Sequence, residues 1–246
     1  EQVVRQIEQK HKYQNKVKEL KYFQDFIDKD SRCLEIGAGW GTLARAIKDK
    51  FNCEMEVIEP SKLAAEVARE YFHLNAYNET FESFAERNGR QDRKYNLIYS
   101  YHVFEHIREP NLFLDKVKEI LDRNGVLFLA LPDALHPEVP SERFFHIEHC
   151  FYYIRKTLEL MLNKHGFKIT RFFKGATDMK VVCLRDDSLP TTALGNSEEY
   201  KKVKKAIGRF DRRHKILKSI KEIIYFPLSE RQRDRTNRII VKLFKK

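Results

Sequence analysis

The sequence predicts an α/β protein with a mostly parallel sheet that is covered by helices on both faces. Short apolar runs alternate along the 246 residues with segments of helical periodicity, and a glycine cluster follows the first run directly. Strands that alternate with helices form a parallel sheet, because each crossover helix packs back on one of its faces. About five residues join the last two runs, which is too short for a parallel crossover, so we expect an antiparallel hairpin there.

The first half of the chain is expected to contribute three strands. Apolar residues recur at helical spacing over residues 3–27, which predicts one or two amphipathic helices that cover the sheet. A helix follows the glycine cluster, and Ser61 is a favoured N-cap for another helix over residues 62–72. The strands are expected at residues 32–36, 53–58 and 75–81, the third as a strand or a turn.

The second half is expected to contribute four strands. A helix over residues 111–121 is followed by a turn at Asn124 and Gly125, and a later helix ends before Gly166. The strands are expected at residues 95–100, 126–131, 167–173 and 179–184. Because ligands of such sheets bind beyond the carboxyl ends of the strands, functional residues should follow the strands.

Positive charge is concentrated at the end of the chain. Residues 187–246 contain 17 Lys and Arg but 7 Asp and Glu, so they carry nearly all of the net charge of +11. After a linker at 187–197, apolar residues recur at steps of three and four up to residue 224, which predicts an amphipathic helix, and a second basic helix is expected over 230–244. We therefore divide the chain into a helical cover (1–29), a near-neutral ligand-binding domain (30–186) and a basic helical extension (187–246).

We expect neither a membrane-spanning protein nor a secreted one. No apolar run approaches the roughly 20 residues that span a bilayer, and the start of the sequence lacks the hydrophobic stretch of a signal peptide. The four cysteines are widely separated and form none of the C-x-x-C pairs of zinc or redox motifs. We expect a cytoplasmic protein.

Residues 35–41, Glu-Ile-Gly-Ala-Gly-Trp-Gly, form a glycine turn directly after the first strand. Glycine lets the chain turn sharply and lets a ligand approach the backbone. The dinucleotide fingerprint G-x-G-x-x-G would require glycine where Thr42 stands, which disfavours a dehydrogenase. The pattern resembles motif I of class I S-adenosylmethionine (SAM) dependent methyltransferases, and the similarity covers about residues 21–184. The resemblance implies a Rossmann-like fold; a turn without a ligand is the alternative.

The resemblance also implies SAM as the cofactor, with S-adenosylhomocysteine as its product. Glu59, at the end of the second strand, could accept hydrogen bonds from both ribose hydroxyls. Phe81 could pack on the adenine and Glu82 could read its edge, although a Phe at a strand end is also typical of a core. The implied SAM-binding residues are Glu35, Gly37, Gly39, Gly41, Glu59, Pro60, Phe81, Glu82, Ser100 and Tyr101.

A first cluster of histidine and glutamate follows the fourth strand. His102, Glu105 and His106 have i, i+3, i+4 spacing, so a helical turn would place them on one face. The segment resembles the Glu-x-x-Glu-His segment of ubiquinone-biosynthesis O-methyltransferases, which is associated there with a divalent metal. Here His102 replaces the first Glu, so we expect no metal. A catalytic or acceptor-positioning role, a metal site and a structural role remain the alternatives.

A second cluster occupies residues 144–153 and contains His146, Glu148 and His149 among aromatic residues. It resembles the Glu-His-x-x-x-Phe segment of bacterial methyltransferases that act on sugars and small metabolites. Because aromatic faces suit sugar rings, we predict that His146, Phe151 and Tyr152 contact the acceptor. A half-buried aromatic patch is the structural alternative.

Methyl transfer to a hydroxyl is an in-line displacement in which a base takes up the proton. We predict that His102 or His149 is this base and that Glu105 or Glu148 orients its imidazole. The predicted catalytic residues are His102, Glu105, His106 and His149. The remaining histidines, which lack a motif context, are assigned to the surface or to packing; they are His11, His73, His136, His165 and His214.

The chain most resembles bacterial methyltransferases that modify small molecules and surface polysaccharides. The predicted reaction is O-methylation of a sugar hydroxyl or phosphate-like oxygen of a capsule or lipopolysaccharide, or of its precursor. The alternatives are a small-metabolite or quinone-type O-methyltransferase, an RNA methyltransferase that uses the basic extension, and a SAM-binding scaffold without activity. Nucleic acid is disfavoured because the domain is nearly neutral and lacks an Asn/Asp-Pro-Pro-aromatic motif.

The basic extension has its own set of predicted partners. It would bind the inner face of the membrane, an anionic or lipid-linked acceptor, or partner enzymes. Alternatively, its apolar face packs on the domain or on a second subunit while its charges are solvated.

Overall fold

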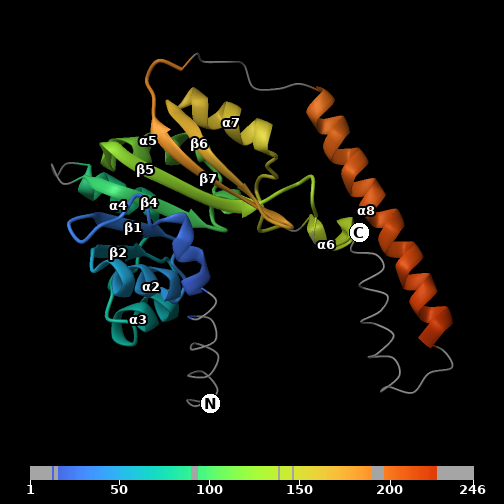
Figure 1. The fold of residues 1–246 in the computed structure, drawn as a ribbon, viewed down its shortest axis with the longest axis horizontal. Coiled ribbons are helices and arrows are strands. Elements are labelled where there is room, and N and C mark those ends of the chain that lie inside the picture. The colour runs from blue at the N-terminus through green and yellow to red at the C-terminus, as the bar shows by residue number, and fades with distance from the viewer. Residues whose placement is uncertain are drawn as a thin grey trace.

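A seven-stranded sheet forms the centre of the molecule (Figure 1). The computed structural model describes residue 13 and residues 16–89, 94–137, 139–145, 147–189 and 197–225, with backbone alone for 220–225. The strand order is β3-β2-β1-β4-β5-β7-β6. The strands are β1 (Arg32–Ile36), β2 (Glu54–Ile58), β3 (Asn75–Tyr77), β4 (Tyr95–Tyr101), β5 (Leu121–Pro132), β6 (Phe167–Lys174) and β7 (Asp178–Arg185).

The pairing of the strands confirms the predicted sheet. The strands β1 to β5 pair in parallel, whereas β7 runs antiparallel to both β5 and β6. The expected turn at Asn124 and Gly125 is wrong, because both residues lie inside β5. Leu121 already pairs with Tyr95, and the register between β4 and β5 shifts after that pair, so the extra residues are taken up as an irregularity within the strand.

Helices cover the sheet and join its strands. They are η1 (Lys18–Tyr22), α2 (Thr42–Phe51), α3 (Lys62–Glu70), α4 (Phe81–Asn88), η2 (Phe104–His106), α5 (Pro110–Ile120), α6 (Ser141–Phe144), α7 (Arg155–Lys164) and α8 (Ser197–Tyr225). Ser61 caps α3 as predicted. The sequence did not predict α4 or α6. The third strand ends at Tyr77, and Thr80 then accepts a hydrogen bond from the Ser83 amide, so that Phe81 begins a helix and does not end a strand.

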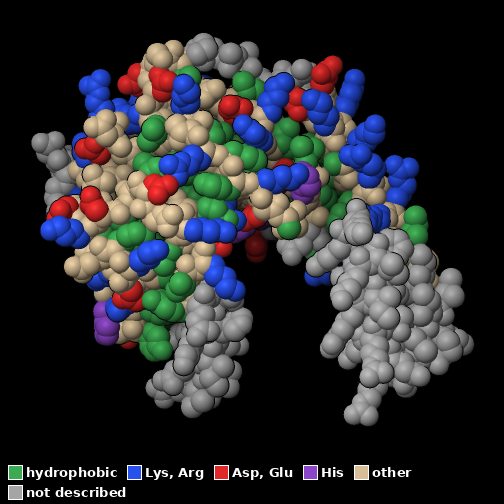
Figure 2. Space-filling view, viewed as in Figure 1, with side chains coloured by type: hydrophobic (Ala, Val, Ile, Leu, Met, Phe, Trp, Pro, Cys, Tyr) green, Lys and Arg blue, Asp and Glu red, His purple; other side chains and the backbone are tan. Residues whose placement is uncertain are grey.

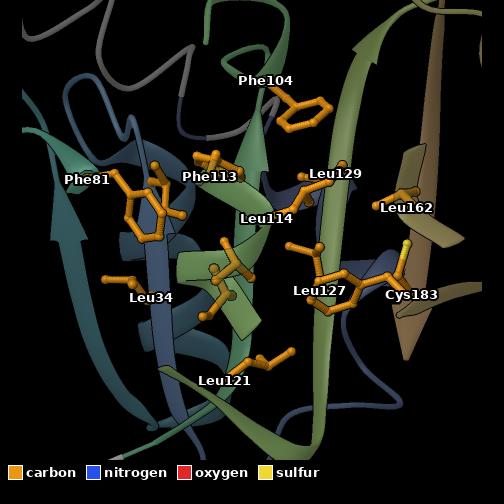
Figure 3. Close-up of a cluster of buried hydrophobic side chains, with 14 of the residues drawn as sticks. Leu34, Phe81, Phe104, Phe113, Leu114, Leu121, Leu127, Leu129, Leu162 and Cys183 are labelled. Carbon is orange, nitrogen blue, oxygen red and sulfur yellow. The ribbon is translucent and has the colours of Figure 1, made fainter. Parts of the chain in front are cut away.

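Two apolar cores lie on the two faces of the sheet. Along β5, Leu127, Leu129 and Leu131 face one core, while the alternate residues Val126 and Phe128 face the other. The first core is closed by α4, α5 and α7, and Figure 3 shows its leucine and phenylalanine side chains meeting over β1, β4 and β5. The second core is closed by α2, α3 and the segment that contains η1. This alternation explains why β5 is apolar on both faces over residues 126–131.

Residues 16–27 pack on the sheet as part of the second core. Phe23 is fully buried, and its ring centroid lies 5.3 Å from that of Tyr99 and 4.7 Å from that of Phe128. Within the described residues, this segment contains the 3-10 helix η1 where the sequence predicted one or two amphipathic helices. The segment therefore belongs to the core of the sheet.

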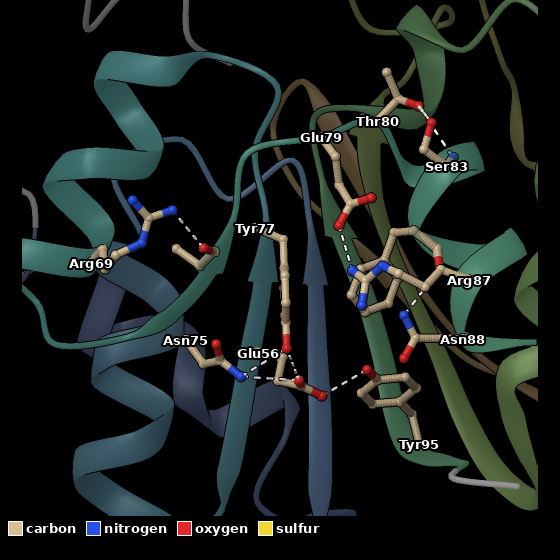
Figure 4. A network of polar contacts seen from close by, with 12 residues as sticks. Glu56, Arg69, Asn75, Tyr77, Glu79, Thr80, Ser83, Arg87, Asn88 and Tyr95 are labelled. Carbon is tan, nitrogen blue, oxygen red and sulfur yellow. Dashed lines mark hydrogen bonds and ion pairs between the residues drawn. The ribbon is translucent and has the colours of Figure 1, made fainter. Parts of the chain in front are cut away.

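A polar network around Glu56 ties strands β2, β3 and β4 together (Figure 4). Its carboxylate accepts hydrogen bonds from the hydroxyl groups of Tyr77 and Tyr95, each at 2.7 Å, and pairs with Arg32. Burial disfavours the charged form, but the hydrogen bonds and the Arg32 charge outweigh it and lower the pKa of Glu56. Arg32 and Tyr95 begin β1 and β4, so these two partners lie at the opposite end of those strands from the glycine loop, and we assign the network a structural role.

The long helix α8 stands at one side of the sheet and contacts it through the segment between β5 and α7 (Figure 1). Ile207 and Val203 pack against Ala134, Phe144 and Ile154. Lys and Arg side chains run along the outer side of α8 in Figure 2. None of the described helices combines the length and the low charge that a membrane span requires. The predicted second basic helix at 230–244 lies outside the described residues.

Candidate active site

The glycine loop connects β1 to α2 in a backbone conformation that glycine adopts readily. Gly37, Gly39 and Gly41 have φ angles of 72°, 55° and 79°. A Cβ on Gly41 would come within 2.5 Å of Leu74, so this glycine lets α2 lie against the α3 region. A Cβ on Gly39 would instead meet nothing within 4 Å. The loop is therefore packed at its end but open at Gly39, where a ligand can approach the backbone.

Glu35 supports the glycine loop from the buried interior of the protein. Its buried carboxylate accepts hydrogen bonds from the Ala44 amide at 3.1 Å and from the Tyr99 hydroxyl at 3.0 Å. Ala44 lies in the first turn of α2, whose N-cap Gly41 has no side chain, so Glu35 supplies the missing cap. Burial raises the pKa of Glu35 to about 8, and the hydrogen bond from Tyr99 opposes this effect.

Glu59 fixes the position of Gly39 from the end of β2. One carboxylate oxygen accepts a hydrogen bond from the Gly39 amide at 2.7 Å, and the other accepts from the Ser61 amide at 2.8 Å. Each carboxylate oxygen has a second lone pair that could accept a hydroxyl group. The neighbouring Pro60 is exposed beside this carboxylate.

The remaining residues of the implied SAM site differ in exposure. Ser100, the last but one residue of β4, lies opposite Ile36, and its buried hydroxyl oxygen has no hydrogen-bond partner among the described residues. Tyr101 is partly exposed and donates a hydrogen bond to Glu19 at 2.9 Å. Phe81 is 4% exposed and packs 4.8 Å from Phe113, so the structure places it in the core and not in an open pocket, while Glu82 is partly exposed on the first turn of α4.

His102 begins a sharp turn at the carboxyl end of β4. Its amide donates to the Ala130 carbonyl of β5 at 2.8 Å, and its φ angle of 56° is unusual for a residue with a side chain. The predicted helical turn is a 3-10 helix that starts only at Phe104. The side chain of His102 remains half-exposed and lies 3.5 Å from the buried carboxylate of Glu105, as the spacing predicted.

The structure joins the two His/Glu clusters that are separate in the sequence. The Glu105 carbonyl accepts hydrogen bonds from the amides of Cys150 and Phe151, and the rings of His106 and His149 lie 4.7 Å apart. His106 Nδ1 lies 2.8 Å from the Glu148 carbonyl oxygen, so that Nδ1 carries the proton and Nε2 keeps its lone pair. The backbone of Glu148 thus orients an imidazole, where the sequence predicted a role for its carboxylate.

Glu105, His106 and His149 could hold a divalent metal, although the presence of His102 in place of the first Glu predicted none. Their ligand atoms lie within 4.8 Å of one another. The second carboxylate oxygen of Glu105 is buried without a hydrogen-bond partner among the described residues. Two imidazoles and one carboxylate suit a first-row transition metal.

The aromatic residues of the predicted acceptor site lie beside these histidines. The Tyr152 ring is 5.5 Å from the His149 ring, and its hydroxyl group donates to the Phe144 carbonyl at 3.1 Å. Phe151 is exposed. His146 lies outside the described residues.

Sequence reasoning missed one polar pair at the same edge of the sheet. Asp133 follows β5 directly and accepts a hydrogen bond from His136 Nδ1 at 2.7 Å. His136 had been assigned to the surface or to packing, but an aspartate three residues before a histidine, at the end of a strand, was a usable signal. His165 makes a similar contact with Asp115 at 2.6 Å, between α7 and α5.

The residues of the loop fit SAM. Gly39 leaves open space above the backbone, the Glu59 carboxylate has lone pairs that could accept hydroxyl groups, and the Ser100 hydroxyl, which has no hydrogen-bond partner among the described residues, lies near the end of β4. These three features surround the point between β1 and β4 where the strand order reverses, which is where open α/β sheets bind ligands.

Two solved structures share this fold. A SAM-dependent methyltransferase from Archaeoglobus fulgidus superposes with a TM-score of 0.57 at 13% identity, over 70% of this chain and 93% of that chain. The CcbJ methyltransferase from Streptomyces caelestis superposes with a TM-score of 0.56 at 13% identity, over 67% and 87%. At 13% identity, these similarities show a shared fold but not a shared substrate.

Sequence comparison identifies the family. The ubiquinone biosynthesis O-methyltransferase of Pelagibacter ubique is 24% identical over 102 residues, which are 42% of this chain and 42% of that protein, so the match spans less than half of that relative. A family model described as a methyltransferase domain matches residues 6–171, more than half of this chain. With its glycine loop and strand order, the chain therefore belongs to the methyltransferase domain family, within the class I SAM-dependent methyltransferases.

Proposed function

We propose that the protein is an O-methyltransferase whose acceptor is a sugar hydroxyl or phosphate-like oxygen of a bacterial cell-surface polysaccharide, such as capsule or lipopolysaccharide, or of its precursor. The observation that carries this proposal is the gathering of half-exposed histidines with aromatic side chains beyond the ends of β4 and β5. His102, His149 and Tyr152 belong to this group. Imidazoles suit proton removal from a hydroxyl, and aromatic faces suit sugar rings.

The glycine loop and the ends of β2 and β4 would hold the cofactor. SAM supplies a methyl group that is activated by its positively charged sulfur. Gly39 would let it approach the backbone, Glu59 would accept hydrogen bonds from its ribose, and Ser100 would offer its free hydroxyl. His102 and His149 would either take the proton of the acceptor or position the acceptor for another base, and the Glu105 carboxylate lies 3.5 Å from His102.

A quinone-type or other small-metabolite O-methyltransferase is the second candidate. It is favoured by the constellation of Glu105, His106 and His149, which could hold a divalent metal, and by the similarity to an enzyme named for ubiquinone biosynthesis. A metal there would bind the acceptor oxygen and lower its affinity for its proton.

The basic face of α8 supports an anionic acceptor or a location at the inner face of the membrane. Its exposed side chains include nine Lys or Arg residues between residues 201 and 218, whereas Ala206 and Ile207 are buried against the domain. The segment that α8 contacts contains Tyr152, so a surface bound by α8 would lie close to the proposed acceptor site. RNA would use the same charges, and its binding would fall steeply with salt.

Methyl transfer from radiolabelled SAM to a panel of acceptors tests the function. The panel contains nucleotide-activated sugars, a polyprenyl-phosphate-linked sugar, the catechol 3,4-dihydroxybenzoate and total RNA, each with EDTA or with added Mn²⁺. We expect label in a sugar acceptor and no effect of EDTA. Label in the catechol that EDTA abolishes would favour the second candidate, and label in RNA would reject both.

Histidine variants test the proposed roles. We expect His102→Ala or His149→Ala to lower turnover about 100-fold while SAM binds normally, because loss of a proton acceptor or misplacement of the acceptor by about 1 Å each costs about that factor. His73→Ala, a variant of a histidine outside this group, is the control. Wild-type turnover in both variants would remove these residues from the mechanism.

A further inference from the structure

Asp133 and His136 form a carboxylate–imidazole pair directly after β5. His136 Nδ1 lies 2.7 Å from one carboxylate oxygen of Asp133, and the Leu135 amide donates to the other oxygen at 2.9 Å. A carboxylate in this position accepts, so Nδ1 carries the proton and Nε2 keeps a lone pair. Asp133 is 5% exposed, whereas the His136 side chain is 37% exposed, so the buried partner orients an accessible imidazole.

The backbone around this pair is fixed at the carboxyl edge of the sheet. The Asp133 amide donates to the Thr177 carbonyl, and the Ala134 amide donates to the Tyr153 carbonyl, each at 2.9 Å. The His136 amide bonds back to the Asp133 carbonyl at 2.9 Å. An imidazole on such a loop has a defined position, as a proton acceptor needs.

The pair lies among the parts of the proposed acceptor site. Three residues before Asp133, the Ala130 carbonyl accepts the His102 amide, so the two histidine-bearing loops leave neighbouring strands. Leu135, next to His136, packs in the same apolar cluster as Tyr152. In Figure 1 this segment lies between the end of β5 and α8.

We propose that His136, positioned by Asp133, is the base that removes the proton of the acceptor hydroxyl. The proposal rests on the proposed O-methyl transfer. In this step the acceptor proton moves to His136 Nε2, and the acceptor oxygen bonds to the methyl carbon while the carbon–sulfur electron pair remains on sulfur. The positive charge thereby passes from the sulfonium to the imidazolium, which Asp133 stabilises. His102 and His149 then position the acceptor.

His165 provides an internal control. It also has a carboxylate at Nδ1, with Asp115 at 2.6 Å, but it lies at the end of α7, at the opposite edge of the sheet from Asp133. Both ring nitrogens of His165 are within hydrogen-bond distance of oxygen atoms, since Nε2 lies 2.9 Å from Asn111. It is the matched histidine without access to an acceptor.

The test is NMR of the full chain labelled with 15N in histidine, with SAM and then S-adenosylhomocysteine at one pH. The ring 15N signals of His136 are assigned by their loss in His136→Gln. We expect them to differ between the two complexes, because the charged methylsulfonium of SAM would lie near the His136 ring. The signals of His165 should be the same in both complexes. We also expect Asp133→Asn to change the tautomer of His136.

A kinetic test uses the acceptor that the panel identifies. With this acceptor, His136→Gln should lower kcat about 100-fold at unchanged affinity for SAM.

The outcomes separate the two proposals. Coincident His136 signals in two saturated complexes, or full turnover in His136→Gln, would overturn the role of His136 and leave the O-methyltransferase standing. Calorimetry that detects no SAM binding would overturn the proposed function and this inference with it.

Discussion

At the scale of single residues, two glutamates hold the glycine loop from opposite sides. Glu35 caps α2 from inside the core, whereas Glu59 bonds Gly39 from the partly exposed end of β2. The sequence placed both at the cofactor, but only the structure separates their tasks, because burial and hydrogen-bond partners depend on the packed helix. Glu35 is thus a structural support, and Glu59 is the one that a ribose could reach.

We predict that Glu35 makes the protein less stable as the pH rises. Because burial raises its pKa from 4.5 to about 8, the folded state binds this proton more tightly than the unfolded state. Its contribution to the free energy of unfolding is therefore lost as the pH rises between these two values, by at most about 1.4 kcal/mol per pH unit. Denaturant unfolding at several pH values should show a flatter dependence for Glu35→Gln than for wild type. The control Glu70→Gln, at an exposed glutamate, should retain the wild-type dependence of the unfolding free energy on pH. The same dependence in Glu35→Gln would show that Glu35 does not cause it.

We predict that Glu59→Gln weakens SAM binding about 10- to 100-fold. The substitution removes charge-assisted hydrogen bonds, which contribute about 1.5–3 kcal/mol. Titration calorimetry measures the affinity, and circular dichroism checks the fold. Glu66→Gln, on the partly exposed side of α3, should bind SAM like wild type. Equal affinity of Glu59→Gln and wild type would show that the ribose is held elsewhere.

At the scale of elements, α8 is attached to the domain by few contacts. Ile207 and Ala206 are buried, Asp211 accepts the Ser141 amide at 2.8 Å, and Glu199 pairs with Lys156. The rest of its described surface is largely exposed and basic. The sequence predicted the helix from its spacing of three and four. It could not predict the partner, because the apolar residues that receive Ile207 come from a segment more than fifty residues away.

We predict that Ile207→Asp detaches α8 without unfolding the domain. A charge in this seam would be buried without a partner, which costs more than the few contacts provide. Limited proteolysis should then cut within residues 197–219, while the melting of the sheet stays close to that of wild type. The matched control is Ile216→Asp, because Ile216 is 57% exposed on the same helix. Equal protection of both variants would show that α8 is held by other contacts.

At the scale of the whole molecule, the charge and the chemistry occupy different parts. The glycine loop, Glu59 and the histidines lie at the carboxyl edge of the sheet, while the excess of Lys and Arg lies on α8 and beyond. We predict that removing residues 196–246 leaves the affinity for SAM within about twofold of wild type but abolishes binding to anionic lipid vesicles. Calorimetry and vesicle sedimentation at low and high salt measure the two effects, since exposed charges are screened by salt. Loss of SAM binding with an intact fold would place α8 in the cofactor site.

The sequence by itself determined the order of the seven strands along the chain, the hairpin and the glycine loop. These features depend on residues close together in the chain, through the alternation of apolar side chains, the length of a connection and the backbone freedom of glycine. The predicted contact between His102 and Glu105 likewise forms, although the helical turn is a 3-10 helix that begins only at Phe104. The sequence predicted Phe81 at the end of the third strand, whereas it begins α4. One phenylalanine does not distinguish the end of a strand from the start of a helix.

Only the tertiary structure decided which polar groups meet. His106 and His149 are 43 residues apart, and their contact at 4.7 Å requires the loops after β4 and β5 to pack together at one edge of the sheet. The same packing buries Asp133 and leaves His136 accessible, whereas the spacing of three residues indicates only that the two side chains can meet. Burial and long-range contact arise from the assembled sheet, so only the folded protein shows which of these polar groups lie together and which are accessible.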